Sequence, residues 1–216
     1  MSDVPAAPID GLKLSPDIEG KHIKTPGQTL LCETAPSTLK FDNDYKVKER
    51  LSQGSFGTVY VTQHIPTGEE FAVKVIDRKR LSKKDNDAVS REVSVLKDCV
   101  DVQHIVRLVD FYVSPSTFYV VQMYARGGDV FERLATRASY TEKDARFLAV
   151  HLLEAMRVLH SRKMAHRDLK PENLLLRDVL DDSGILVADF GFARYVPEDK
   201  LKTRCGTREL TLTTIQ

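Results

Sequence analysis

The stretch His166-Arg167-Asp168-Leu169-Lys170-Pro171-Glu172-Asn173 decides how the rest of this sequence is interpreted. It supplies a carboxylate, a lysine and a carboxamide close together, and a second motif, Asp189-Phe190-Gly191, begins 21 residues after Asp168. Transfer of a phosphoryl group from a nucleotide needs a group that orients a hydroxyl, a cation near the moving phosphoryl and oxygen ligands for Mg²⁺. The two motifs together supply groups of these three kinds.

Composition sets broad limits on what the chain does. Its 216 residues, 42% apolar and 29% charged, are ordinary for a globular protein of one or two domains. A net charge of +1 argues against a nucleic-acid or membrane-surface partner. No apolar run is long enough to span a bilayer, and the start MSDVPAAPIDG lacks a secretory signal pattern. We therefore expect a cytoplasmic or nuclear protein, whose three cysteines are reduced and structural.

Periodicity along the chain predicts a strand-rich part followed by a helix-rich part. Five of the nine prolines fall within residues 1–40, so residues 1–44 are predicted to be a disordered or extended leader. From Tyr45 onward the pattern predicts a hairpin around a glycine-bearing turn, strands over 71–76, 105–113 and 118–123, and helices over 85–98 and 141–160. Thr141 and Asp144 resemble a capping box at the start of the second helix. This order favours an α+β fold of two packed lobes.

The motifs resemble those of eukaryotic Ser/Thr protein kinases. The resemblance implies a two-lobe kinase-like fold with a complete small β-rich lobe and a partial helical large lobe, and ATP bound between them. It assigns 1–44 to the leader, 45–124 to the small lobe with its hinge, 125–209 to the partial large lobe and 210–216 to a divergent tail. Lys170-Pro171-Glu172 is typical of Ser/Thr kinases rather than tyrosine kinases. A small-molecule kinase of similar fold fits the motifs less closely.

Leu51-Ser52-Gln53-Gly54-Ser55-Phe56-Gly57-Thr58-Val59 resembles the glycine-rich loop that covers the phosphates of ATP. A simple hairpin turn is the alternative interpretation. Ser52 stands where the family has its first glycine, which predicts a modest loss of nucleotide affinity. The residues of this loop expected to contact the nucleotide are Leu51, Ser52, Gly54, Phe56, Gly57 and Val59.

Lys74 interrupts an apolar strand, where an unpaired ammonium would be costly to bury. By the resemblance it pairs with nucleotide phosphates and with Glu92 on the helix over 85–98. The alternatives are a surface lysine that extends to solvent, or a pairing with Glu69 or Glu70, which we place in a solvent-facing turn.

The stretch FYVVQMYARGG, residues 118–128, resembles the hinge between the lobes. The resemblance makes Gln122 the gatekeeper and lets the backbone of Met123 to Ala125 face adenine. Asp129 then contacts ribose or a basic substrate residue, with a helix N-cap as the alternative. Ala72 and Leu174 are expected to pack on the two faces of adenine, or otherwise to be core residues.

For the catalytic loop, the resemblance implies that Asp168 orients the substrate hydroxyl and that Lys170 neutralises the transferring phosphoryl group. Asn173 and Asp189 would hold Mg²⁺. Asp129 and Glu172 would favour substrates with basic residues upstream of the Ser or Thr acceptor. Arg167 would bind a phosphate on the activation segment, with Thr203 as its acceptor.

Three features resemble the calcium/calmodulin-dependent group of kinases: the acidic insert over 178–184, the run Gly128-Asp129-Val130-Phe131, and Thr203-Arg204-Cys205-Gly206-Thr207. Calcium/calmodulin regulation is therefore expected in a full-length form. After Glu209 the sequence reads LTLTTIQ where a kinase continues to Ala-Pro-Glu, so we expect a truncated, misspliced or frame-shifted large lobe. The alternative function is a non-catalytic nucleotide-binding or interaction fragment that competes with a full-length kinase.

Overall fold

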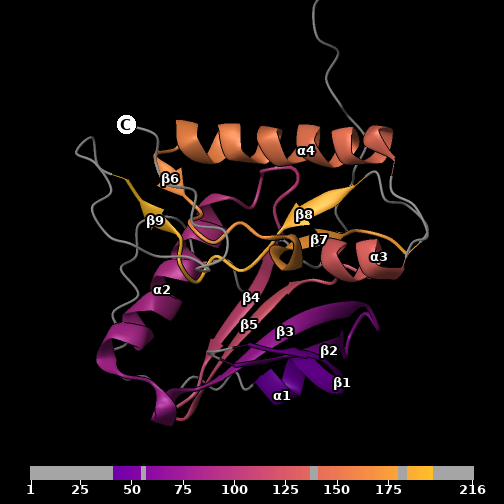
Figure 1. The fold of residues 1–216 in the computed structure, drawn as a ribbon. Helices are drawn as coiled ribbons and strands as arrows, with labels where there is room; N and C mark the ends of the chain where they lie inside the picture. Colours follow the sequence, from indigo (N-terminus) through magenta and orange to yellow (C-terminus); the bar gives the residue numbers. More distant parts are fainter. Residues whose placement is uncertain (1–40, 55–56, 137–140, 180–183, 197–216) are drawn as a thin grey trace, which may run out of the picture. The chain divides into compact units, whose positions relative to one another are not determined.

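The computed structural model describes residues 41–54, 57–136, 141–179 and 184–196, all of which belong to one unit, Ala35–Gln216. No helix in these ranges is both long and apolar enough to cross a membrane. The chain first builds an antiparallel five-stranded sheet in the order β1-β2-β3-β5-β4 (Figure 1). Its strands are β1 Tyr45–Gln53, β2 Thr58–His64, β3 Glu70–Asp77, β4 Leu108–Val113 and β5 Thr117–Met123. The predicted hairpin and strands are thus confirmed.

Two helices carry capping boxes that fix where they begin. Helix α2, Lys83–Asp98, starts after Ser82, whose hydroxyl accepts the amide of Asp85. Helix α4, Glu142–Ser161, starts after Thr141, which accepts the amide of Asp144 as predicted. The shorter helical elements are α1 Phe41–Asp44, η1 Arg78–Arg80, α3 Val130–Thr136 and η2 Pro171–Asn173.

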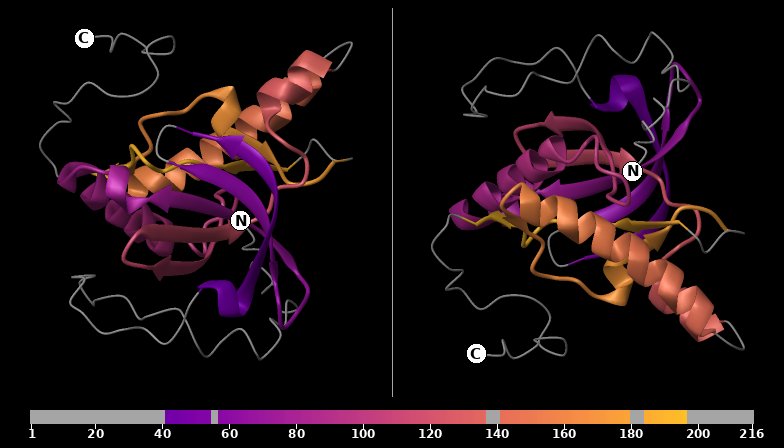
Figure 2. Two further views of the ribbon diagram at one scale, coloured as in Figure 1. Left: turned by 90° about the horizontal axis from the view of Figure 1, so that it is seen from below. Right: turned by 90° about the horizontal axis from the view of Figure 1, so that it is seen from above.

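Two small ribbons lie in the second half of the chain. They pair β6, Met164–Ala165, with β9, Arg194–Tyr195, and β7, Leu174–Leu176, with β8, Ile185–Val187. Figures 1 and 2 show α4 and the five-stranded sheet on opposite sides of the β7–β8 ribbon. One core runs through all these layers, since Ile76 and Val120 of the sheet, Leu96 of α2 and Leu159 of α4 belong to the same buried cluster.

Two boundaries differ from the sequence predictions. The leader was expected to run to residue 44, but Phe41 is buried and its ring stacks on Tyr45 and on Tyr119, at centroid distances of 5.4 and 4.3 Å. The last four residues of the expected leader form α1, which places Phe41 in the sheet's aromatic cluster, and residues 1–40 lie outside the described ranges. The strand expected from Ile105 begins at Leu108, because Ile105 forms an isolated bridge with Val187 instead.

Candidate functional site

The turn between β1 and β2 contains the glycine-rich loop. The Gly54 amide donates to the Gly57 carbonyl at 2.9 Å, which closes the turn. A Cβ on Gly57 would lie 2.4 Å from the Val75 carbonyl oxygen, whereas a Cβ on Gly54 would meet nothing closer than 3.7 Å. Gly57 is therefore required by its close approach to β3, while Gly54 leaves room above the loop. Ser55 and Phe56 lie outside the described residues.

Ser52 occupies an ordinary strand position. It pairs with Val59 across the hairpin, and it is not among the described non-glycine residues with positive φ. A serine therefore causes no backbone strain here, although a glycine is the family's residue. Leu51 is 43% exposed, as expected for a side chain that would cover a ligand.

Lys74 meets two carboxylates that come from different elements. Its Nζ lies 2.9 and 3.2 Å from the two oxygens of Glu92 on α2, and 3.1 Å from Oδ1 of Asp189. Glu92 is only 3% exposed, and the Lys74 side chain is 14% exposed. The predicted pair of Lys74 and Glu92 thus forms in the structure, and it brings Asp189 into the same cluster.

Burial and charge oppose each other at this cluster. Burial alone would lower the pKa of Lys74, but the charges of Glu92 and Asp189 raise it well above its ordinary value. Burial alone would raise the pKa of Asp189, but the Lys74 ammonium lowers it below its ordinary value. The net pKa shift of each group favours its ionised form. The cluster therefore holds the ammonium cation of Lys74 beside the carboxylate of Asp189.

The expectation for Glu70 was wrong in part. Glu70 is the first residue of β3 rather than part of a turn, and its carboxylate pairs with Lys48 at 2.9 Å and Arg126 at 3.5 Å. These two cations hold the Glu70 carboxylate away from Lys74. The prediction that Lys74 pairs with Glu92 is thus confirmed, although the sequence did not show that Glu70 has partners of its own.

The catalytic loop forms a second cluster around Asp168, which is 5% exposed. Lys170 Nζ lies 3.2 Å from Oδ2 of Asp168. The Asn173 side-chain amide donates to the Asp168 carbonyl at 2.8 Å and to Oδ2 at 3.1 Å. Because the amide nitrogen of Asn173 is used in this way, its oxygen is the atom left for a cation.

His166 also forms hydrogen bonds to the backbone around this cluster, a role that our sequence analysis did not assign. Its Nδ1 accepts the Asp168 amide at 3.3 Å, and its Nε2 lies 2.9 Å from the Ala188 carbonyl oxygen. Burial lowers the pKa of His166, which favours the neutral ring that these two contacts need. The ring also packs against the edge of buried Phe190, at a centroid distance of 4.7 Å.

A backbone hydrogen bond connects the two clusters. The amide of Ala188, the residue before Asp189, donates to the Asn173 carbonyl at 2.8 Å. Asp189 itself has φ of 57°, which is uncommon for a residue other than glycine. The arrangement thus fixes Asp189 beside Lys74 and also beside the loop that carries Asp168.

The hinge segment follows β5, where Gln122 pairs with Ala72 of β3. The Met123 amide donates to the Arg107 carbonyl at 2.9 Å, and Ala125 is buried. Asp129 adopts the alternative we left open: its Oδ1 accepts the Glu132 amide at 2.8 Å and caps α3. One oxygen of this carboxylate is therefore already used within the protein.

Leu174 takes the alternative that the sequence left open, that of a core residue. It is partly buried and packs against the clusters that contain Val187 and Leu176. Side chains alternate along a strand, which places its neighbour Leu175 on the other face of β7. Leu175 belongs to no buried cluster of the described residues, and it replaces Leu174 as the candidate for the nucleotide-facing leucine.

Glu172, Arg167 and Thr203 were expected to bind the substrate or a regulatory phosphate. Glu172 is exposed in η2, as a carboxylate for a basic substrate would need to be. Arg167 has φ of 70° and donates from Nε to the Phe192 carbonyl at 2.8 Å. Thr203 lies outside the described residues.

The fold and the two clusters define a protein kinase domain, and comparisons with known proteins agree. Residues 45–211 match the family described as Protein kinase domain, and the chain belongs to this family. Members of this family generally use ATP and Mg²⁺.

The similar proteins include several calcium/calmodulin-dependent kinases. The chain is 40% identical over 163 residues to calcium/calmodulin-dependent protein kinase type 1B of Homo sapiens, covering 76% of this chain and 47% of that protein. It is 40% identical over 167 residues to calcium/calmodulin-dependent protein kinase cmkB of Emericella nidulans, covering 76% and 41%. It is 34% identical over 164 residues to myosin light chain kinase A of Dictyostelium discoideum, covering 76% and 55%. The chain thus spans about half the length of the curated relatives it matches.

Proposed function

We propose that the two clusters are the MgATP-binding and catalytic site of a protein kinase that transfers the ATP γ-phosphoryl group to Ser or Thr. The observation that carries this proposal is the position of Lys74 Nζ, 2.9 Å from Glu92 and 3.1 Å from Asp189. Three separate elements must come together for these contacts to form. A lysine held in this way presents a fixed positive charge to the phosphates of a nucleotide.

The donor atoms of the site suit Mg²⁺. Asp189 and Asn173 offer a carboxylate and an amide oxygen, and the side chain of Asp189 is 44% exposed. Hard cations such as Mg²⁺ prefer oxygen ligands. When bound, Mg²⁺ would neutralise negative charge on the phosphate oxygens. Asn173 and Asp189 are therefore the residues that would hold it.

The other residues position the reacting groups. Asp168 accepts hydrogen bonds from Asn173 and lies 3.2 Å from Lys170, so its carboxylate is held in one orientation. From there it would orient the substrate hydroxyl, while Lys170 would face the transferring phosphoryl group. Catalysis by such a site rests mainly on positioning and electrostatic stabilisation. The remaining residues of the proposed nucleotide site are Leu51, Ser52, Gly54, Phe56, Gly57, Val59, Ala72, Gln122, Met123, Ala125, Asp129 and Leu175.

Replacing Asp189 by alanine should abolish the Mg²⁺ dependence of ATP binding. The change removes one of the two proposed Mg²⁺ ligands and leaves the Lys74–Glu92 pair in place. Nucleotide affinity is measured by titration with and without Mg²⁺. Wild type should bind more tightly with Mg²⁺, whereas the variant should bind equally under both conditions.

Asp87→Ala is the matched control, because Asp87 is an exposed carboxylate on α2 that is remote in sequence from both motifs. It should keep the full Mg²⁺ effect. Equal Mg²⁺-dependent binding by wild type and Asp189→Ala would refute the metal assignment.

The substrate is proposed to carry basic residues upstream of its Ser or Thr acceptor, selected by Asp129 and Glu172. Calcium/calmodulin regulation in a longer form is proposed from the names of the relatives. To measure selectivity, residues 45–209 are joined to the remainder of the catalytic domain of the type 1B relative. Peptides with arginine or alanine upstream are then compared by kcat/KM.

Asp129→Asn and Glu172→Gln should each reduce the preference for arginine by up to about 5-fold, the equivalent of an exposed ion pair worth ~1 kcal/mol. Asparagine caps helices as well as aspartate does, so Asp129→Asn should leave α3 intact. If the parent chain and both variants show no preference, the basic-substrate proposal is wrong, while the ATP site stands.

A further inference from the structure

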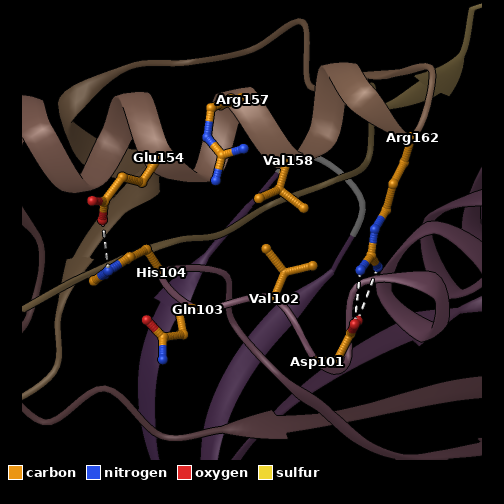
Figure 3. Close-up of a pocket in the computed structure, with 8 residues that line it drawn as sticks. All are labelled: Asp101, Val102, Gln103, His104, Glu154, Arg157, Val158 and Arg162. Carbon is orange, nitrogen blue, oxygen red and sulfur yellow. Dashed lines mark hydrogen bonds and ion pairs between the residues drawn. The ribbon is translucent and has the colours of Figure 1, made fainter. Parts of the chain in front are cut away.

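A group of metal-ligating side chains lies outside the kinase site, between α4 and the loop that precedes β4. His104, His151 and Glu154 each offer a ligand atom, and these atoms lie within 4.8 Å of one another. His151 and Glu154 are three residues apart on α4 and so share one face of the helix. His104 contacts Glu154 beside an open hollow of about 350 Å³ that is also lined by Arg157 (Figure 3).

The contacts of His104 leave one ring nitrogen poorly satisfied. Its Nδ1 lies 3.3 Å from the Ile185 carbonyl oxygen, and its Nε2 lies 3.4 Å from Oε2 of Glu154. A neutral imidazole carries only one N–H. In either neutral tautomer, one ring nitrogen therefore presents a lone pair to an oxygen lone pair. A cation between His104 and Glu154, either a proton or a metal ion, removes this repulsion.

The packing of the two histidines disfavours protonation of both rings. Their rings stack at a centroid distance of 4.2 Å, where two imidazolium charges would repel each other. Neutral imidazoles are the form that binds metals.

His151 adds an independent sign that a ligand is missing. Its Nδ1 is buried and has no hydrogen-bond partner among the residues that the structure describes. Buried polar atoms without a partner are rare in folded proteins and call for an explanation. A metal ion bound through Nδ1 would supply this atom with its missing partner.

We propose that His104, His151 and Glu154 form a binding site for Zn²⁺ or a similar borderline-soft divalent cation. Two histidines and one carboxylate are a known zinc ligand set, with water completing a tetrahedron. At metal–ligand distances of about 2.0–2.1 Å, tetrahedral ligand atoms lie about 3.3 Å apart. The pair His104 Nε2 and Glu154 Oε2, at 3.4 Å, already has this spacing. The ligand atom of His151 lies within 4.8 Å of the other two, and its ring must turn out of the stack with His104 to reach the ion.

The position of the site gives it a structural consequence. His104 has φ of 62°, and its carbonyl accepts the Val187 amide at 2.8 Å. Val187 ends β8, two residues before Asp189. A metal ion bound here would hold the loop before β4 against α4, and with it the strand that leads to Asp189. The site therefore stabilises the fold next to the catalytic residues without taking part in phosphoryl transfer.

Metal binding is tested on the full chain with Cys32 and Cys205 changed to serine, since both thiols lie outside the described residues and bind zinc well. Zn²⁺ affinity is measured by competition with a chromophoric chelator in excess Mg²⁺, and ligand geometry from the visible absorption of bound Co²⁺. We expect one ion per chain and a tetrahedral Co²⁺ spectrum. Glu154→Gln and His151→Gln should each weaken binding by more than about 10–100-fold, the loss seen even for outer-sphere partners.

His160→Gln is the matched control, because His160 is an exposed histidine on the same helix and lies outside the cluster. It should bind as tightly as the parent. Glu154 has a side chain 53% exposed, so its replacement by glutamine should leave the fold intact. Zn²⁺ should also raise the melting temperature of the parent and not that of Glu154→Gln. Equal affinity for the parent and Glu154→Gln, or no binding to the folded parent, would overturn the proposal.

Discussion

Replacing Lys74 by methionine is expected to lower the free energy of unfolding by about 3–5 kcal/mol, the cost of breaking a buried ion pair from one side. Glu92 is 3% exposed and would be left buried without its partner. Typical domains are stable by only about 5–15 kcal/mol, so this single change removes a large part of the total. The measurement is equilibrium unfolding in urea, with the slope checked for constancy.

The chain contains a matched control of the same geometry. Lys48 pairs with Glu70 at 2.9 Å, the same distance as Lys74 with Glu92. The side chains of this surface pair are each 31% exposed. Lys48→Met should therefore cost no more than about 1 kcal/mol. The double variant Lys74→Met/Glu92→Gln should recover most of the loss, because the buried carboxylate of Glu92 is removed as well and the side chain of Asp189 is 44% exposed. A Lys74→Met cost as small as that of Lys48→Met would show that the buried pair does not stabilise the fold.

The pKa shifts predict how this difference changes with pH. The pKa of Lys74 is raised, so its contribution is complete below the unfolded value of about 10.4 and is lost as the pH rises through the folded value. The pKa of Asp189 is lowered, so its contribution is complete above about 3.9 and is lost as the pH falls through its folded value. The gap between wild type and Lys74→Met should thus be widest between these limits.

The residues proposed to carry the chemistry could be named from the sequence because the proposed reaction restricts their types and their spacing. Lys74, Glu92, Asp168, Lys170, Asn173 and Asp189 all lie in the two clusters that the motifs indicated. Helix α4 was predictable for a similar local reason, since the Thr141–Asp144 capping box needs only four consecutive residues.

Features that depend on long-range contacts escaped prediction. A motif gives the order of Leu174 and Leu175 but not which of them faces the core, which depends on how β7 pairs with β8. Phe41 appeared to belong to a proline-rich leader, because its stacking partner Tyr119 is distant in the sequence. The pairing of His104 with His151 was not predicted for the same reason, since only the fold places their rings 4.2 Å apart.

A polypeptide of these 216 residues, purified by itself, is expected to show little or no kinase activity. Phe147, Val150 and Leu153 project from α4 with exposed fractions of 46%, 45% and 67%. Each large apolar side chain left in water forgoes about 1.5–3 kcal/mol, and a patch of them promotes aggregation. Helix α4 packs directly against β6 and β8, which flank the catalytic loop and Asp189. A loosely held α4 would therefore disturb the position of the catalytic residues.

Small displacements are enough to remove activity while nucleotide binding persists. Misplacement by about 1 Å can cost on the order of 100-fold in rate, because positioning supplies most of phosphoryl-transfer catalysis. Lys74 and Glu92 belong to the sheet and α2, so weak ATP binding should survive. The assay is phosphate transfer to a generic basic peptide, with Asp168→Ala as the background. Kinases typically turn over at about 1–100 s⁻¹. A turnover in this range that disappears in Asp168→Ala would contradict the prediction. It would show that α4 holds the site in place without its exposed face being covered.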